Sequence, residues 1–449
     1  MNSMVKQQYI TLYQQYAHII KEKSAPLLNS IRDAAFKRFE ELGFPVKRDK
    51  DYEYIDIQSS YDHDFGLNLN RVSLDVDPYK VFTCDVPNIQ SYLCFIVNDT
   101  FYANPEPKIS LPKGVIVASL NEICTTHPDL VKPYLFKNMD WENDPNQAFN
   151  ATFAQDGLFI YVPKNVVVDV PIQLVNLMHG NDDLLAVNHN LIIVEEGASV
   201  KLLVCDHASN EKKYLANRLT EIFVGKNASY EHYKSENTHN QTMNLGTVLV
   251  HQDDDSRFLS NTLTLHNGIT RNNITVHVDG QNAEAIVGGL AIGDKTQKID
   301  NYVSMNHLKP NSTSLQLFKY ILDDQAKGVF TGKIIIKEDA QKIAAYQTCK
   351  TICLTNTATI NTKPQLEIFA DDVKCSHGAT VGQLDETALF YLRSRGIPIN
   401  EAKLLLMYAF VHDVLEHISV DAVKDRIRLL VEKRLRGELS KCNGCVICK

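Results

Sequence analysis

Apolar positions change their spacing twice along the chain, and the changes divide it into three regions. Residues 1–42 carry apolar side chains at helical intervals, with Pro26 between two expected helices. From Leu158 to Phe369 the apolar runs are short and rich in β-branched residues, a pattern typical of strands. The helical spacing returns after Gly378. We therefore expect a helical and mixed domain at 1–149, a β-rich core at 150–378 and a helical domain at 379–449.

A short corner recurs between the expected strands of the core. In each corner an Ala or Ser follows a Gly, Asn, Asp, Gln or Thr just before a new apolar run, and the corners end at Ala198, Ala228, Ala283, Ser312, Ala326, Ala340 and Ala358. The spacings are 30, 55, 29, 14, 14 and 18 residues, which cluster near multiples of one short unit. Such a repeat indicates stacked coils, that is, a parallel β-helix whose open ends need caps. A large antiparallel sandwich with ordinary turns also fits the pattern, and the corners alone do not separate the two.

Candidate chemistry is concentrated between Lys363 and Pro398. If residues 373–377 are extended, Cys375 and His377 project from one face, because side chains two residues apart in a strand share a face. A thiolate and an imidazole are both ligands for iron, but a cluster usually needs four ligands, so this face offers an incomplete site. The simpler alternative is a small buried cysteine beside a hydrogen-bonded histidine at a strand end.

The same stretch resembles the C-terminal signature of the SufB and SufD family of iron-sulfur cluster assembly proteins. The matching residues are Lys363-Pro364, Leu366 to Ile368, Ala370 to Gly378 and Leu389 to Gly396. Phe39 to Ile57 is similar to the amino-terminal segment of the SufD branch, with Tyr52 where the family has Trp and Ile55 where it has Thr.

This resemblance implies a right-handed parallel β-helix core between helical terminal domains. It also implies a non-catalytic scaffold that pairs with SufB through the C-terminal ends of both β-helices. By the resemblance, His377 and Cys375 lie at or near that interface, with the histidine as the stronger candidate ligand. The cofactor is then a transient iron-sulfur cluster shared with SufB, and the isolated chain holds none permanently. A homodimer that supplies all four ligands is the alternative pairing.

The resemblance further implies a docking site for SufC, an ABC-type ATPase, on the C-terminal helices. We place this site on the segment from Ile399 to Ile418 and single out Leu406, Phe410 and Val414. Part of the apolar stripe on this segment must instead pack against the core. The chain itself has no phosphate-binding loop, because the segment from Gly328 to Ile334 is one residue too short and lacks the Ser or Thr that holds magnesium.

Two other groups of residues carry candidate chemistry. Asp371 and Asp372 are paired carboxylates, which on a β-helix could serve a polysaccharide lyase or hydrolase, although two carboxylates that order a turn are the simpler interpretation. Cys442, Cys445 and Cys448 have the C-x-x-C-x-x-C spacing of a zinc or iron-sulfur site. Three thiols leave one position open, so incidental cysteines at a terminus remain the simpler interpretation.

Net charge and the distribution of apolar residues indicate which partners and which cell compartment to expect. The 46 basic and 54 acidic residues give a net charge of -8, which argues against a nucleic-acid-binding surface. No apolar run has the length of a membrane span, and the first residues lack the pattern of a secretion signal. We therefore expect a cytoplasmic protein whose ten cysteines are reduced.

Overall fold

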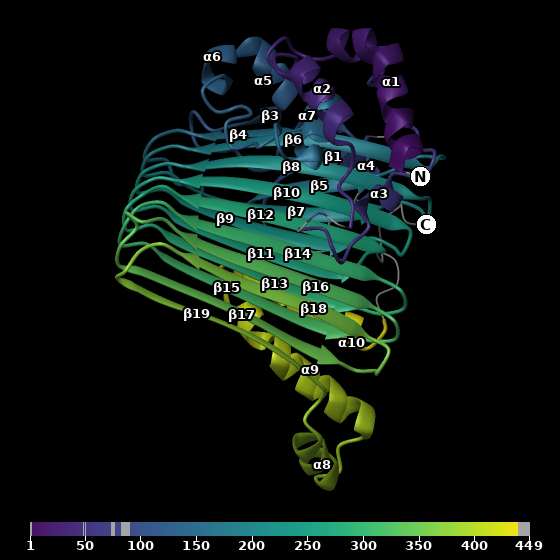
Figure 1. Cartoon of the computed structure of the whole chain (residues 1–449), viewed down its shortest axis with the longest axis vertical. Coiled ribbons are helices and arrows are strands. Elements are labelled where there is room, and N and C mark those ends of the chain that lie inside the picture. Colours follow the sequence, from purple (N-terminus) through teal and green to yellow (C-terminus); the bar gives the residue numbers. More distant parts are fainter. Residues whose placement is uncertain (1, 48, 50, 73–76, 82–89, 439–449) are drawn as a thin grey trace.

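Two parallel β-sheets wind around a common interior and form a β-solenoid, with helices from both ends of the chain packed outside it (Figure 1). The structure is a computed structural model and describes residues 2–47, 49, 51–72, 77–81 and 90–438. The ten-stranded sheet has the order β19-β17-β15-β13-β11-β9-β7-β5-β1-β2, and the nine-stranded sheet has the order β18-β16-β14-β12-β10-β8-β6-β4-β3. We call them sheet B and sheet A.

The N-terminal region contributes seven helices and three short strands to the described part of the chain. They are α1 (Asn2–Glu22), α2 (Arg32–Leu42), α3 (Ile57–Ser60), α4 (Pro78–Val81), β1 (Tyr92–Val97), β2 (Thr100–Tyr102), β3 (Ile116–Ser119), α5 (Leu120–Thr126), α6 (Pro128–Val131) and α7 (Pro145–Phe153). The break between α1 and α2 contains Pro26, so the two helices expected before residue 42 are confirmed.

The solenoid strands follow without an intervening helix. They are β4 (Leu158–Val162), β5 (Ile172–Met178), β6 (Leu184–Val194), β7 (Ser199–Ala208), β8 (Tyr214–Val224), β9 (Ser229–Asn237), β10 (Thr242–Gln252), β11 (Arg257–His266), β12 (Ile269–Val278), β13 (Glu284–Gly293), β14 (Lys298–His307), β15 (Thr313–Leu322), β16 (Lys327–Ile336), β17 (Ile343–Cys353), β18 (Thr359–Ile368) and β19 (Val373–Gly382). Three helices end the described chain: α8 (Glu386–Ser394), α9 (Ile399–Glu416) and α10 (Asp421–Leu435).

From β4 onward each strand pairs in parallel with the strand two places later in the chain, so consecutive strands alternate between the sheets. This order confirms the parallel solenoid and excludes the antiparallel sandwich. The only antiparallel pairs among the described strands are β1 with β2 and β3 with β4, at the head of each sheet.

The recurring corners have a backbone explanation. The residue before the Ala or Ser has a positive φ at Gly197, Asn227, Asn282 and Asn311. Glycine and asparagine tolerate this left-handed conformation best, so their recurrence marks four of the turns from sheet A to sheet B. The corners that end at Ala326 and Ala358 lie at turns from sheet B to sheet A. Asp255 has the same conformation, with a φ of 57°, and Ser256 follows it. That additional corner divides the unexplained spacing of 55 residues into two coils.

Helices cover the outer faces of the two sheets at different places. The N-terminal helices pack on the outer face of sheet A, where Tyr9, Phe39 and Phe149 meet Leu185 and Leu215. Helices α9 and α10 pack on the outer face of sheet B, through a cluster that contains Val411, Val414, Ile427, Leu263 and Leu290. Among the described helices, none combines the length and apolarity needed to cross a membrane.

The two ends of the solenoid differ. At the first coil, Phe101, Leu111 and Val115 close the interior, and all seven residues of β5 are buried. At the last coil, no residue of β18 or β19 is fully buried. Helix α8 extends away from this end, opposite the N-terminal helices, and buries none of its residues (Figure 1). The C-terminal end of the solenoid is therefore open.

Candidate functional site

The last strand of sheet B, β19, positions both Cys375 and His377. Among the described residues β19 pairs only with β17, and β18 pairs only with β16, so each strand has a free edge at the open end. Val373 and Cys375 pack against the solenoid interior. Because side chains alternate along a strand, His377 lies on the same inward face. The two side chains therefore share a face, as the sequence spacing predicts.

Their surroundings differ although they are neighbours. Cys375 is half-buried, and burial raises the pKa of its thiol, while the backbone N–H of Ala345 acts in the opposite direction. The thiol is therefore protonated at neutral pH in the isolated chain and must lose its proton before it binds a metal. His377 is exposed at the edge of the open end. Its ring is accessible to a protein that covers this end.

Two glutamines lie directly behind His377 in the interior, and sequence reasoning missed both. Gln316, Gln347 and His377 occupy the same register position on β15, β17 and β19. Gln347 Nε2 donates a 2.8 Å hydrogen bond to Gln316 Oε1, and both glutamines are buried. We call these three residues the terminal ladder. Their spacing of 31 and 30 positions in the chain is the coil repeat, the one sequence signal that could have linked them.

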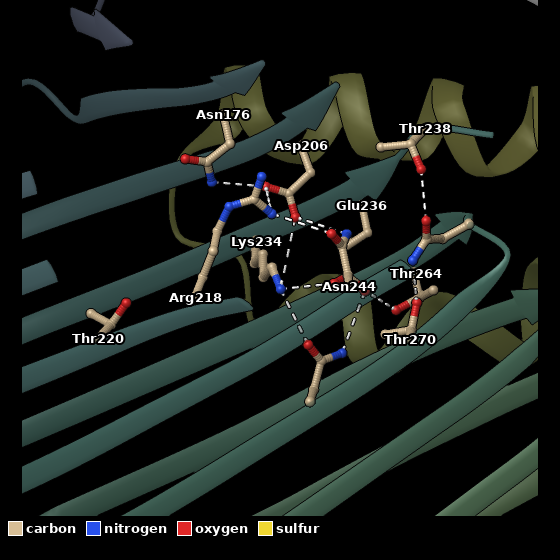
Figure 2. Close-up of polar contacts among 12 residues, drawn as sticks. Asn176, Asp206, Arg218, Thr220, Lys234, Glu236, Thr238, Asn244, Thr264 and Thr270 are labelled. Atoms are coloured by element: carbon tan, nitrogen blue, oxygen red, sulfur yellow. Dashed lines mark hydrogen bonds and ion pairs between the residues drawn. The ribbon is translucent and has the colours of Figure 1, made fainter. Parts of the chain in front are cut away.

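A second set of polar side chains fills the interior nearer the middle of the solenoid (Figure 2). Asp206 lies 3.5 Å from the Arg218 guanidinium and 3.8 Å from the Lys234 ammonium, and Lys234 lies 2.7 Å from Glu236. Thr264 donates a hydrogen bond to Glu236, and Asn176 donates one to Asp206. We call Asp206, Arg218, Lys234 and Glu236 the central cluster.

The charges of the central cluster balance, with two acids and two bases. Burial alone raises the pKa of the Asp206 carboxyl, but the charges of Arg218 and Lys234 and the hydrogen bond from Asn176 outweigh it and leave the pKa below its ordinary value. Its opposite charges lie within 4 Å of one another, and this pairing offsets the cost of placing Asp206, Glu236 and Arg218 in the core.

Two other groups of candidate residues were expected from the sequence, the paired carboxylates and the C-terminal cysteines. Asp371 and Asp372 are exposed at the corner between β18 and β19, where the backbone of Asp372 bonds to Gln341 and Lys342. This position orders a turn and lacks the burial that tunes catalytic carboxylates. Cys442, Cys445 and Cys448 lie outside the described residues.

The three α9 residues differ in accessibility. Leu406 and Phe410 are half-buried, and the Lys319 ammonium lies 4.7 Å from the Phe410 ring centre. Val414 is completely buried against sheet B. Val414 thus belongs to the part of the apolar stripe that packs on the core.

No group of three or more His, Cys, Asp or Glu side chains is arranged to hold a metal ion anywhere in the described chain. Within that part of the chain, Cys375 and His377 offer two potential ligands at an edge, fewer than the four that usually hold a cluster.

Comparison with known proteins gives this edge a context. A sequence profile described as "SUF system FeS cluster assembly, SufBD core domain" matches residues 177–410, and one described as "SufBD protein N-terminal region" matches residues 3–174. The chain belongs to the SufBD family. The core profile begins within β5 and ends within α9, so it includes the open coil and both edge residues.

Several curated relatives agree with this assignment. The chain is similar to an iron-sulfur cluster assembly SufBD family protein of Synechocystis, with 29% identity over 91% of each chain. It is also similar to the iron-sulfur cluster assembly protein SufD of Escherichia coli, with 32% identity over 56% of this chain and 59% of the relative. SufD of Bacillus subtilis is 29% identical over 72% of this chain and 75% of the relative. This SufBD family member is therefore linked to iron-sulfur cluster assembly.

Proposed function

We propose that this SufBD family member is a non-catalytic scaffold subunit of the Suf complex, pairing with SufB and docking the SufC ATPase. In this proposal His377, together with Cys375, contributes to a transient cluster assembly site at the interface with SufB. The observation that carries the proposal is the open last coil, where two free strand edges, a thiol and an imidazole lie together.

The surface around this coil supports an interface. Large apolar side chains are exposed on and beside the last coil at Tyr346, Ile368, Phe369, Val381, Phe390 and Tyr391. Phe369 is 60% exposed and Phe390 is 73% exposed. Exposed apolar side chains near unpaired strand edges are typical of a protein-binding edge rather than a free surface. A second β-helix that adds its own edge strands would satisfy both the backbone groups and the apolar side chains.

The accessible parts of the C-terminal helices support docking of SufC. Leu405 on α9 is exposed and Leu406 and Phe410 are half-buried, while Val414 supports the helix from below. Helices α9 and α10 are fixed to sheet B, whereas α8 buries none of its residues. An ATPase bound here would act on a rigid support close to the open coil.

The proposal is tested by co-expression of the chain with SufB and SufC, followed by mass measurement and by iron, sulfide and absorbance measurements after cluster reconstitution. We expect a complex that contains all three proteins. His377→Ala should leave the complex intact and lower the cluster yield by about tenfold or more, because even loss of a residue that supports a metal ligand costs about that much.

His18→Ala is a matched control, because His18 is an exposed histidine on α1, at the far end of the molecule. It should change neither assembly nor cluster yield. A chain that stays alone during co-expression would contradict the pairing, and an unchanged yield with His377→Ala would remove this residue from the site. A complex of two copies of this chain would indicate the homodimeric scaffold instead.

A further inference from the structure

A backbone carbonyl determines the direction of the hydrogen bonds in the terminal ladder. Gln316 Nε2 donates a 3.3 Å hydrogen bond to the carbonyl oxygen of Lys333, which can only accept. The Oε1 atom of Gln316 therefore faces Gln347, which must turn its Nε2 toward it, at 2.8 Å. The assignment of oxygen and nitrogen in both amides follows from this carbonyl and needs no arbitrary choice.

One acceptor remains at the outer end of the ladder. Gln347 Oε1 is buried and has no hydrogen-bond partner within the described chain. A buried carbonyl oxygen without a donor is costly, and such groups are rare in folded proteins. The next residue in register is His377, one strand spacing of about 4.8 Å away.

Strand β16 of sheet A, on the other side of the interior, leaves room for the Gln347 side chain. A Cβ atom on Gly332 would lie 1.4 Å from Gln347 Nε2, so only glycine allows Gln347 to occupy its position. In the last coil Pro364 is in register with Gly332, as His377 is with Gln347. Proline has no side-chain hydrogen-bond group. Gln347 is therefore the polar group that the interior presents to His377.

We propose that Gln347 is a positioning residue for His377, and that its Oε1 accepts a hydrogen bond from the inward nitrogen of the imidazole ring. In the neutral ring, this bond places the proton on the inward nitrogen. The other nitrogen keeps its lone pair and faces the open end, where a partner would lie. Histidines that bind metals commonly donate their second N–H to a carbonyl oxygen in this way. The two residues are adjacent in register and Gln347 Oε1 has no partner among the described residues, so the hydrogen bond between them is the proposal, and its role in metal binding rests on the proposed function.

The contact is tested first in the full-length chain without partners, with 15N-labelled histidine and His377→Ala to assign the ring signals. We expect one tautomer of the His377 ring and a ring N–H proton with a through-space contact to the Gln347 side chain. Gln347→Met, which keeps the volume and removes the acceptor, should make this proton exchange with water about fivefold faster. Gln347→Glu in its protonated form keeps an acceptor oxygen for His377 and an O–H donor for Gln316 Oε1, and should restore the protection.

Thr351→Val is the matched control, because Thr351 is another buried inward residue of β17 but is in register with Val381 rather than His377. It should leave the His377 signals unchanged. The proposal is overturned if the wild-type ring shows no contact with Gln347, a measurement that needs no variant to fold. It is also overturned if Gln347→Met folds with unchanged proton exchange and tautomer.

The metal role is tested separately, by titration of ferrous iron and sulfide into the complex with SufB and SufC. Gln347→Met should lower the cluster yield about tenfold, and Gln347→Glu should recover most of it. If the ring signals respond to Gln347→Met but neither this variant nor His377→Ala changes cluster yield, the contact stands and the proposed cluster site fails.

Discussion

The central cluster and the terminal ladder are two polar regions in the same solenoid interior, built on opposite plans. The central cluster balances two acids with two bases, and neighbouring amides and hydroxyls donate to its carboxylates. The terminal ladder places two buried amides behind His377, and its Gln347 Oε1 accepts no hydrogen bond from the described residues in this structure. The first region pairs its opposite charges within the chain, although Arg218 Nε has no hydrogen-bond partner among the described residues. The second region, in our proposal, is completed by His377 at the open edge.

We therefore expect the central cluster to contribute to the stability of the fold and the residues at the open edge to contribute to binding. Buried charges that are paired hold a core together only as a set, since removal of one leaves the others uncompensated. An exposed group at an edge contributes little to folding, and it is free to bind something else. We expect the two regions to respond to substitution in opposite ways.

The largest effect is expected at the centre. Asp206→Ala leaves the Arg218 and Lys234 charges without one of their partners in a buried site, so it should lower the free energy of unfolding by about 3 to 5 kcal/mol. Urea unfolding followed by circular dichroism measures this. The exposed Asp371→Ala should change the same quantity by less than about 0.5 kcal/mol. Equal effects of the two substitutions would contradict the assignment of Asp206 as a core charge.

A smaller loss of stability is expected at Gly332, which lies on sheet A opposite Gln347. Gly332→Ala should lower the free energy of unfolding by about 1 to 3 kcal/mol, because the new Cβ atom displaces the Gln347 amide. In a Gln347→Ala background the same substitution should cost clearly less, since the obstructing amide is absent. A double-mutant cycle by urea unfolding measures the coupling, and additive effects would show that Gly332 and Gln347 do not compete for space.

The centre should also respond to pH. Burial and the nearby Lys234 charge lower the pKa of His232 to about 3. The unfolded chain binds a proton at this histidine below about pH 6.5 and the folded chain does not, so stability is full above pH 6.5 and falls as the pH decreases. Between pH 7 and pH 5.5 the loss from this residue should be about 1 kcal/mol. His232→Gln should reduce the change in urea midpoint between these pH values, and an unchanged pH dependence would contradict a neutral buried His232.

The smallest effect on stability is expected at the edge. His377→Ala should lower the free energy of unfolding by no more than about 1 kcal/mol, because the side chain is exposed and the substitution removes only the proposed hydrogen bond to Gln347. The same urea experiment measures it. A loss of several kcal/mol would mean that His377 is a structural residue and would weaken its assignment to a shared site.

The sequence predicted the features that depend only on residues close together in the chain: the turns between strands, the faces of a strand and the apolar stripe of a helix. The corners at Gly197 and Asn227 revealed the coil repeat because one backbone conformation is needed at each turn. Cys375 and His377 were placed on one face because strand geometry alone decides it. The spacing of α9 predicted its apolar stripe.

The sequence did not predict which side chains meet inside the solenoid. Gln316 and Gln347 meet only when two coils are stacked in register, and nothing local marks either residue as inward-facing. The central cluster has the same property, with Asp206 and Glu236 on successive coils. Helical spacing likewise showed the stripe that contains Val414 but not which sheet would cover it.

The free edges of β18 and β19 have a consequence for the cell's supply of subunits. Each is a ten-residue strand whose outer edge pairs with no other described strand, and Phe369 next to β18 and Val381 within β19 are both exposed. An edge of this kind accepts any extended polypeptide, including another misfolding chain. In the proposed pairing with SufB, copies made in excess of SufB should therefore be the ones that aggregate or are degraded, and production of the two subunits in matched amounts would limit that loss.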